Sequence, residues 1–392
     1  MIVDPLAPNS VDPVVPAPLS PVAPTPSDPV VPAPFGVYVH VPFCRSRCDY
    51  CAFATYTDRD HLMEEYAAAC IVETRRAVDE GMPVATSVFF GGGTPSRLPA
   101  DLLCDVLDSI PRGPGAEVTV ECNPEDAQPG RLALYREAGV TRISLGVQST
   151  SPHVLSGLGR RHTPGVVVDA AAAVAGAGFA SWNMDLIIGG AGETDGDWES
   201  SLADLIGLPD PPPHVSAYAL TVEPGTPLAA DPDRHPDDDT QAARYERADE
   251  VLTAAGYQWE EISNWARPGH ECRHNHLYWD QGNYRGIGSA AHSHHEGRRW
   301  WNVRTPDRYV REIGAGHSAQ AGEEILTGSQ RAFEALTLSL RTRSGVPATA
   351  VPDDPDLRGL VTSDHGRSVL TVRGRLLANA VSARLVVDAS AN

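Results

Sequence analysis

The 392-residue sequence has few basic residues and no long apolar run. It carries 31 Lys and Arg residues against 51 Asp and Glu residues, a formal net charge of −20. A surface that binds nucleic acid needs clustered basic side chains, so this charge argues against one. No apolar run reaches the roughly 18 residues that cross a bilayer, and no charged region followed by an apolar core opens the chain. We therefore expect neither a membrane span nor a signal peptide, and we expect small molecules or proteins as partners.

The chain has seven cysteines, an odd number, and three of them lie in one short loop at Cys44, Cys48 and Cys51. This distribution is typical of a metal site in a reducing compartment and not of a secreted disulfide framework, so we predict a cytoplasmic protein. Three thiols are one short of the four ligands of a closed site, so a metal bound here keeps an exchangeable position. A zinc site completed by a distant histidine is the alternative.

Residues 1–34 contain eleven prolines. Such a composition cannot bury a hydrophobic core, so we predict that this segment is a disordered, proline-rich tail. No function can be assigned to it from its residues.

From Phe35 to about residue 256, short apolar runs alternate with longer amphipathic stretches in six pairs. This alternation predicts a parallel sheet with right-handed crossovers. Six units fall short of the eight that close a full barrel, so the pattern favours an open, partial barrel. The strand candidates are residues 37–41, 87–90, 117–122, 142–147, 181–187 and 214–220.

Glycine, acidic and amide residues lie at the carboxyl ends of these strand candidates. Ligands of parallel barrels gather where the strand ends converge, so we expect these residues to share one site with the cysteine loop. Consecutive glycines let the backbone approach a ligand closely, and the polar side chains supply hydrogen-bonding groups. The residues are Gly93, Thr94, Glu121, Gln148, Asp185 and Ala219.

A segment rich in Trp and His follows residue 260 and contains His-Asn-x-x-Tyr-Trp at residues 274–279. A neutral imidazole at His274 is a good axial ligand for heme iron, and the adjacent aromatic residues offer flat apolar surface for a porphyrin. On spacing alone, a packing role for His274 in an aromatic core is the preferred interpretation. Further candidates for a heme ligand are His276, His292, His294 and His295.

The spacing Cys-x3-Cys-x2-Cys resembles the [4Fe-4S] motif of the radical SAM superfamily. With the string Tyr-x-His-x-Pro-Phe at residues 38–43, it resembles the subgroup around oxygen-independent coproporphyrinogen III oxidase. The string at residues 274–279 resembles a signature of the HemW heme chaperones, and this resemblance reverses the preference for a packing role. Together these resemblances imply an α/β fold with two parts. Residues 35–260 are expected to form a partial (β/α)6 radical SAM barrel, and residues 261–392 a heme-motif segment with a small C-terminal extension domain.

In that superfamily the fourth iron of the cluster binds the amino and carboxylate groups of S-adenosyl-L-methionine. The resemblance implies that the three loop cysteines hold the [4Fe-4S] cluster and that His274 binds heme. Structural alternatives stay open, in which Glu121 and Asp185 are paired strand-end carboxylates and Arg160 is a solvated charge. The residues implied to contact S-adenosylmethionine are Tyr38, Tyr50, Gly93, Thr94, Glu121, Gln148, Arg160, Asp185 and Ala219.

The resemblance implies a heme chaperone that binds heme and transfers it to an acceptor protein, with an electron donor as a further partner. The alternative is an oxygen-independent coproporphyrinogen III oxidase, in which a radical derived from S-adenosylmethionine drives decarboxylation of propionate side chains. The decarboxylating enzymes carry a further cysteine where this chain has Phe53 and lack the histidine string, and both features favour the chaperone. A cluster protein with a scaffold role only, a homodimer and a peripheral membrane contact stay open.

Overall fold

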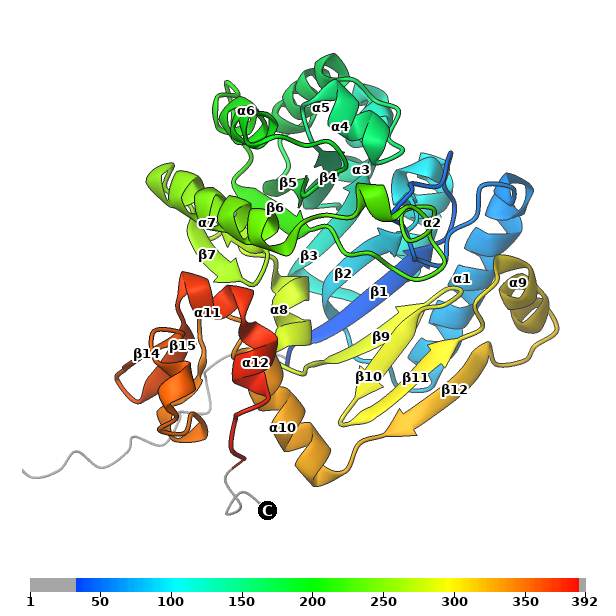
Figure 1. Ribbon diagram of the computed structural model, residues 1–392. Coiled ribbons are helices and arrows are strands. Elements are labelled where there is room, and N and C mark those ends of the chain that lie inside the picture. The colour runs from blue at the N-terminus through cyan, green and yellow to red at the C-terminus, as the bar shows by residue number, and fades with distance from the viewer. Residues whose placement is uncertain (1–32, 388–392) are drawn as a thin grey trace, which may run out of the picture. The chain divides into compact units, whose positions relative to one another are not determined.

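The computed structural model describes residues 33–387 (Figure 1). The predicted proline-rich tail therefore lies outside the described residues, apart from Ala33 and Pro34. The described part forms one twelve-stranded sheet and a separate three-stranded sheet. None of its helices is long and apolar enough to cross a membrane.

The six predicted strands are confirmed, and they pair in parallel in chain order. The sheet does not close on itself within the described residues, because further strands occupy both of its edges. The prediction of a partial barrel is therefore confirmed. The six strands are β1 (Phe35–Val41), β2 (Ala85–Gly92), β3 (Arg112–Cys122), β4 (Arg142–Gln148), β5 (Ser181–Ile188) and β6 (His214–Ala219).

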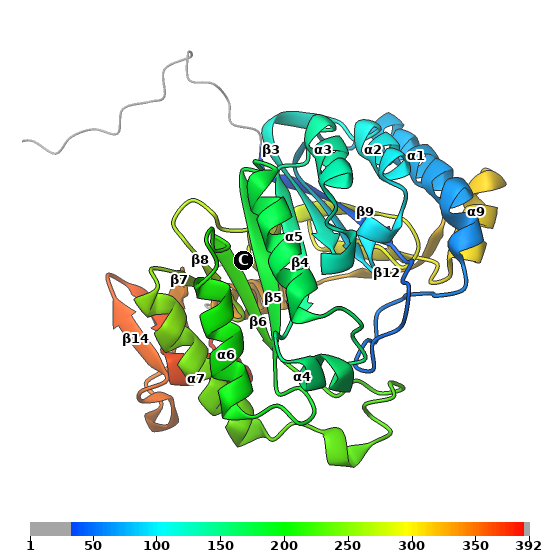
Figure 2. The ribbon, with the colours of Figure 1, turned by 90° about the horizontal axis from the view of Figure 1, so that it is seen from above.

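Helices follow these strands and cover the outer side of the sheet, as Figure 2 shows from above. The amphipathic stretches between the strand candidates form helices, and Trp198 on α6 and Tyr245 on α7 are buried. The helices are α1 (Met63–Asp79), α2 (Ala100–Asp108), α3 (Pro129–Glu137), α4 (Pro152–Gly157), α5 (Pro164–Gly176), α6 (Asp195–Ile206) and α7 (Asp238–Ala254).

Successive side chains of β2–β6 alternate between two environments, as the period of two in a strand requires. Apolar residues such as Val88 and Val215 belong to the main hydrophobic core. Many of the intervening positions are polar, and Ser144, Asn183 and Ser216 line a cavity inside the barrel together with a few apolar residues such as Phe89 and Ile187. Parallel sheets are usually apolar on both faces, so the polar inner face marks the interior as the functional side.

The chain after α7 completes both edges of the large sheet. One hairpin adds to the free edge of β6 in antiparallel pairing, while β9 pairs in parallel with β1 and carries three antiparallel strands beyond it. The predicted boundary at residues 260–261 lies within β7, and the division into two domains stays a prediction. The elements are β7 (Gln258–Glu261), β8 (Asn264–Ala266), α8 (Arg273–Trp279), β9 (Asn283–Ile287), β10 (His292–His295), β11 (Arg298–Asn302), α9 (Pro306–Gly314) and β12 (Gln320–Ile325).

The last part of the described chain has a small hydrophobic core of its own, which includes Leu340, Val346 and Val381. The elements are α10 (Gly328–Ser339), β13 (Val346–Pro347), β14 (Val361–Asp364), β15 (Arg367–Leu370), α11 (Val372–Leu376) and α12 (Ala378–Ser382).

The turn after β9 is fixed against β1 through Tyr66. Its hydroxyl donates to the His40 carbonyl at 2.8 Å and accepts from the Ser289 N–H at 2.8 Å. Gly288 has φ of +98°, and a Cβ there would lie 2.5 Å from the Tyr66 hydroxyl and 2.7 Å from the His40 carbonyl oxygen. Glycine is therefore required by both the backbone conformation and the space.

We expect Gly288→Ala to lower the free energy of unfolding by roughly 3 kcal/mol, because strain and a steric clash add. Gly256→Ala is the matched control, since Gly256 has φ of +88° with no atom within 4 Å of the added Cβ. The control loses only about 1 kcal/mol from the backbone conformation. Urea unfolding of both variants measures the difference, and equal losses would contradict the packing argument.

Candidate functional site

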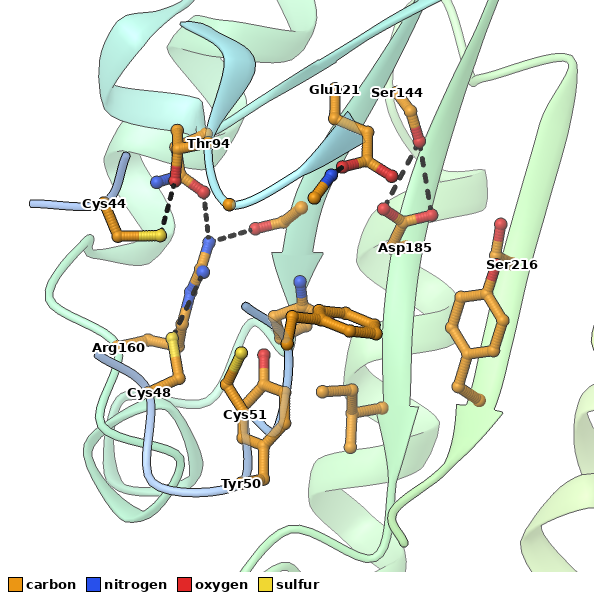
Figure 3. A pocket seen from close by; sticks show the side chains of 18 of the residues that line it. Cys44, Cys48, Tyr50, Cys51, Thr94, Glu121, Ser144, Arg160, Asp185 and Ser216 are labelled. Carbon is orange, nitrogen blue, oxygen red and sulfur yellow. Dashed lines mark hydrogen bonds between the residues drawn. The ribbon is translucent and has the colours of Figure 1, made fainter. Parts of the chain in front are cut away.

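A cavity of about 640 Å³ lies inside the barrel and is lined by the carboxyl-terminal parts of the strands and the cysteine loop. The structure brings most of the predicted site residues together there, and Figure 3 shows several of them facing one another. Tyr38 and His274 are not among its lining residues. The predicted residues that line the cavity are Cys44, Cys48, Tyr50, Cys51, Gly93, Thr94, Glu121, Gln148, Arg160, Asp185 and Ala219.

The cysteine loop follows β1 directly, and all three of its thiols are free. The Thr94 hydroxyl donates to Cys44 Sγ at 3.6 Å, and Arg160 Nη1 donates to Cys48 Sγ at 3.6 Å (Figure 3). The loop turns back on itself through a bond from the Cys51 N–H to the Cys48 carbonyl at 3.2 Å. Burial raises the pKa of the Cys44 thiol to about 11, so this thiol keeps its proton at neutral pH until a metal displaces it.

The donor set fits an iron–sulfur cluster better than a single ion. Within residues 33–387, no group of three or more His, Cys, Asp or Glu side chains is placed to hold one metal ion. A cluster does not require the thiols to converge on one point, because each thiolate binds a different iron. Hydrogen bonds to two of the sulfurs provide the outer support that tunes such a cluster.

The glycine run after β2 packs against the cysteine loop. The Gly93 N–H donates to the Val41 carbonyl at 2.8 Å, and a Cβ at Gly93 would lie 2.9 Å from the Phe43 carbonyl oxygen. The absence of a side chain thus allows the two loops to meet. Contact of Gly93 with S-adenosylmethionine stays a prediction.

Glu121 and Asp185 project into the cavity from β3 and β5. The Glu121 carboxylate accepts a bond from the Gly92 N–H at 3.2 Å. Burial and the nearby Asp185 charge raise the pKa of Glu121 to about 8. Burial also raises the pKa of Asp185, although Asn183 Nδ2 donates to it at 2.6 Å and the Ser144 hydroxyl donates to it at 3.3 Å. Both carboxyl groups therefore face the cavity, and burial raises the pKa of each.

Arg160 is held inside the cavity and is not the solvated charge of the structural alternative. Its Nη2 donates to Asn123 Oδ1 at 2.9 Å and to the Gly146 carbonyl at 2.6 Å. Gln148 adopts a left-handed φ of 72° where the pairing of β4 with β5 shifts register. Such a conformation is costly for a residue with a side chain and is typical of functional sites.

His274 is fully buried in the core between α8 and β2. Its Nδ1 bonds to the Ser87 hydroxyl at 2.9 Å, and its Nε2 bonds to the Tyr278 hydroxyl at 2.9 Å. Its ring stacks on Phe89 with centroids 5.3 Å apart, and burial lowers its pKa to about 3. Both nitrogens are thus occupied, so the described conformation gives His274 a packing role, and iron ligation would require one of these bonds to break.

The other predicted candidates are dispersed. The Tyr38 hydroxyl bonds to His40 Nδ1 at 3.1 Å, and burial raises the pKa of Tyr38. Among the described residues, no further heme-ligand candidate lines the cavity. These histidines are His276, which pairs with Glu260, His292, which stacks on Trp301, His294, which bonds the Gly282 carbonyl, and His295.

The comparison with known proteins settles the family. The family model of the radical SAM superfamily matches the sequence of this chain over residues 38–205. A heme chaperone HemW from Mycobacterium tuberculosis is 42% identical over 367 residues, which cover 87% of this chain and 92% of the relative. The chain belongs to the HemW family. A HemW from Synechocystis is 35% identical over 80% of this chain and 79% of its own length.

A solved structure of coproporphyrinogen III oxidase from Escherichia coli, a radical SAM enzyme, superposes with a TM-score of 0.78. The alignment covers 90% of this chain and 89% of that structure at 22% identity. At this identity the likeness shows the fold alone. It confirms the predicted radical SAM architecture and does not favour the oxidase over the chaperone.

Sequence reasoning missed the row of polar residues around the Asp185 carboxylate. These residues occupy the same alternate positions of β4–β6 that carry Asp185, so their period of two was a usable signal. They were treated as ordinary strand residues because small hydroxyl and amide side chains carry no motif. The missed cavity residues are Ser144, Asn183, His214 and Ser216.

We expect Glu121→Gln to remove a pH dependence of stability. The folded protein keeps a proton on Glu121 that the unfolded chain loses, so the wild type loses stability as pH rises from about 4.5 to about 8. At pH 8 we expect the free energy of unfolding of the variant to exceed that of the wild type by an amount on the order of 2 kcal/mol, since the side chain lines a cavity. Urea unfolding of cofactor-free protein at pH 5 and pH 8 tests this, and identical pH profiles for the two proteins would contradict it.

Proposed function

We propose that the protein binds heme and transfers it to acceptor proteins, and that its barrel carries a [4Fe-4S] cluster and S-adenosylmethionine. The observation that carries this proposal is the 42% identity to a heme chaperone over 87% of the chain. In this proposal residues 35–260 hold the cluster and S-adenosylmethionine, and residues 261–392 carry the heme motif.

Cys44, Cys48 and Cys51 are the proposed cluster ligands. When bound, the cluster supplies single electrons and an iron that takes the amino and carboxylate groups of S-adenosylmethionine. Thr94 and Arg160 donate to two of the thiol sulfurs, and such bonds stabilise the thiolate form. This support is in place before any ligand enters, because both donors are fixed by the barrel.

The cavity has groups that match the charges of S-adenosylmethionine. Glu121 is the proposed acceptor for its ammonium group, since the carboxylate has one protein donor and a raised pKa that a cation would lower. Arg160 and Gln148 face the cavity and suit its carboxylate, and Asp185 suits ribose hydroxyl groups. The remaining proposed contacts are Tyr38, Tyr50, Gly93, Thr94 and Ala219.

The proposed partners are heme, a heme-acceptor protein and an electron donor, and the proposed compartment is the cytoplasm. Seven free cysteines, three of them in one loop, support a reducing environment. Arg47 and Arg161 are exposed at the cavity rim, which provides positive charge at the entrance of an otherwise acidic protein.

Heme titration after anaerobic cluster reconstitution tests the proposal, with absorbance as the measurement. We expect saturation at one heme per chain and no decarboxylation of coproporphyrinogen III when S-adenosylmethionine and a reductant are supplied. A variant with all three loop cysteines changed to serine separates heme binding from cluster binding. Decarboxylated product without heme binding would establish the oxidase instead.

Two variants test heme ligation by His274 in opposite directions. His274→Ala removes the imidazole and is expected to weaken heme binding. Tyr278→Phe keeps the imidazole but removes the hydroxyl that occupies Nε2, so ligation no longer has to break that bond. Because this variant does not have to break the hydrogen bond between Nε2 and Tyr278, we expect its heme affinity to be roughly 2-fold to 10-fold higher than that of the wild type. Unchanged affinity in both variants would show that His274 only packs.

A further inference from the structure

A continuous row of polar groups connects Asp185 in the cavity with His276 on α8. Asn183 Nδ2 lies 2.6 Å from Asp185 Oδ1, and Asn183 Oδ1 lies 2.6 Å from His214 Nδ1. On its other side, His214 Nε2 lies 3.0 Å from Glu260 Oε2. Glu260 Oε1 lies 2.8 Å from His276 Nε2, whose side chain is 33% exposed. The three middle members are almost completely buried.

The Asp185 carboxylate determines which way the Asn183 amide points. An ionised carboxylate only accepts hydrogen bonds, so the NH2 group of Asn183 faces it. The same NH2 group lies 2.8 Å from the Ser144 hydroxyl and 3.0 Å from the Ser216 hydroxyl. Turned the other way, the amide would place its carbonyl oxygen 2.6 Å from a carboxylate oxygen, and two acceptors at that distance repel.

The amide orientation in turn determines the proton on His214. Because the Asn183 carbonyl oxygen faces Nδ1, this nitrogen carries a hydrogen whether the ring has one proton or two. Burial and the Arg142 charge act to lower the pKa of His214, whereas the Glu260 carboxylate that faces Nε2 acts to raise it. A hydrogen bond from Nε2 to that carboxylate requires a second hydrogen on the ring, so the row corresponds to a doubly protonated His214 paired with an ionised Glu260. The ring is therefore fixed between one amide and one carboxylate.

Glu260 anchors the row at its far end. Burial acts to raise its pKa, but hydrogen bonds from His214 and His276 hold the pKa well below the usual range. It also accepts the Cys272 N–H at 2.9 Å, at the start of α8. The anchor is thus an ionised carboxylate tied to a helix terminus.

We propose that His214 is a positioning residue for the cavity. Its Nδ1–H holds the Asn183 amide in the orientation that the Asp185 carboxylate requires, and that amide in turn holds Asp185 with a carboxylate oxygen directed at the ligand. The inference rests on the proposed function, because it requires S-adenosylmethionine in the cavity. Figure 3 shows Asp185 beside Ser144 and Ser216, on the wall that this row supports.

Two conservative variants of His214 separate its two nitrogens. Asparagine places its NH2 group near the position of Nδ1 and keeps the donor to Asn183, whereas glutamine reaches the position of Nε2 and keeps only the contact with Glu260. Equilibrium dialysis of S-adenosylmethionine against anaerobically reconstituted protein measures the effect. We expect His214→Gln to bind about tenfold more weakly than wild type and His214→Asn to bind within about twofold of it.

Equal affinity of the two variants, whether both retain or both lose binding, would overturn the positioning role, because a merely structural histidine does not distinguish the nitrogens. Thermal unfolding of each variant verifies the fold. If His214→Gln does not fold, Asn183→Asp is used in its place, because aspartate keeps the shape of asparagine but lacks the NH2 group. Unchanged S-adenosylmethionine binding by Asn183→Asp would overturn the inference. Absent binding by the wild type overturns the cofactor site itself, which distinguishes the two failures.

Discussion

A polar interior inside a parallel sheet is stable only if each buried donor and acceptor finds a partner, since one left alone costs about 1–3 kcal/mol. The barrel meets this requirement by pairing side chains across neighbouring strands, as Ser144, Asn183 and Ser216 do. The requirement is not met everywhere: Glu121 has one backbone donor and a neighbouring negative charge, and among the described residues the cavity-lining Thr119 hydroxyl and Arg142 Nη2 have no partner. This unmet requirement supports the proposed role of Glu121 as the acceptor for a cationic group.

The strands, the open barrel and the residues at its rim could be predicted from sequence because they depend on local patterns. Alternation over a few residues identifies a strand, and the carboxyl end of a parallel strand identifies the rim. Contacts such as Ser87 with His274 or His214 with Glu260 could not be predicted, because the partners lie far apart along the chain. Their pairing is decided by strand register and by how α8 packs, which no local pattern contains.

The His-Asn-x-x-Tyr-Trp string shows how a motif and a site can differ. The motif lies on α8, where Asn275 lines the cavity while His274 faces β2. The start of this helix is held by buried carboxylates, since Glu117 accepts the His274 N–H at 3.0 Å and Glu260 accepts the Cys272 N–H. One short helix therefore connects the polar interior with the hydrophobic core.

The pairing of β1 with β9 constrains the order in which the molecule can be completed. Phe35 pairs with Asn283, so one edge of β1 has no strand partner until residue 287 has left the ribosome. At roughly 5–20 residues per second, that interval is on the order of 10–50 seconds. The cysteine loop emerges directly behind β1 at the start of this interval. A cluster delivered early would meet a strand with one open edge, whereas one delivered after β9 has paired would meet a finished support.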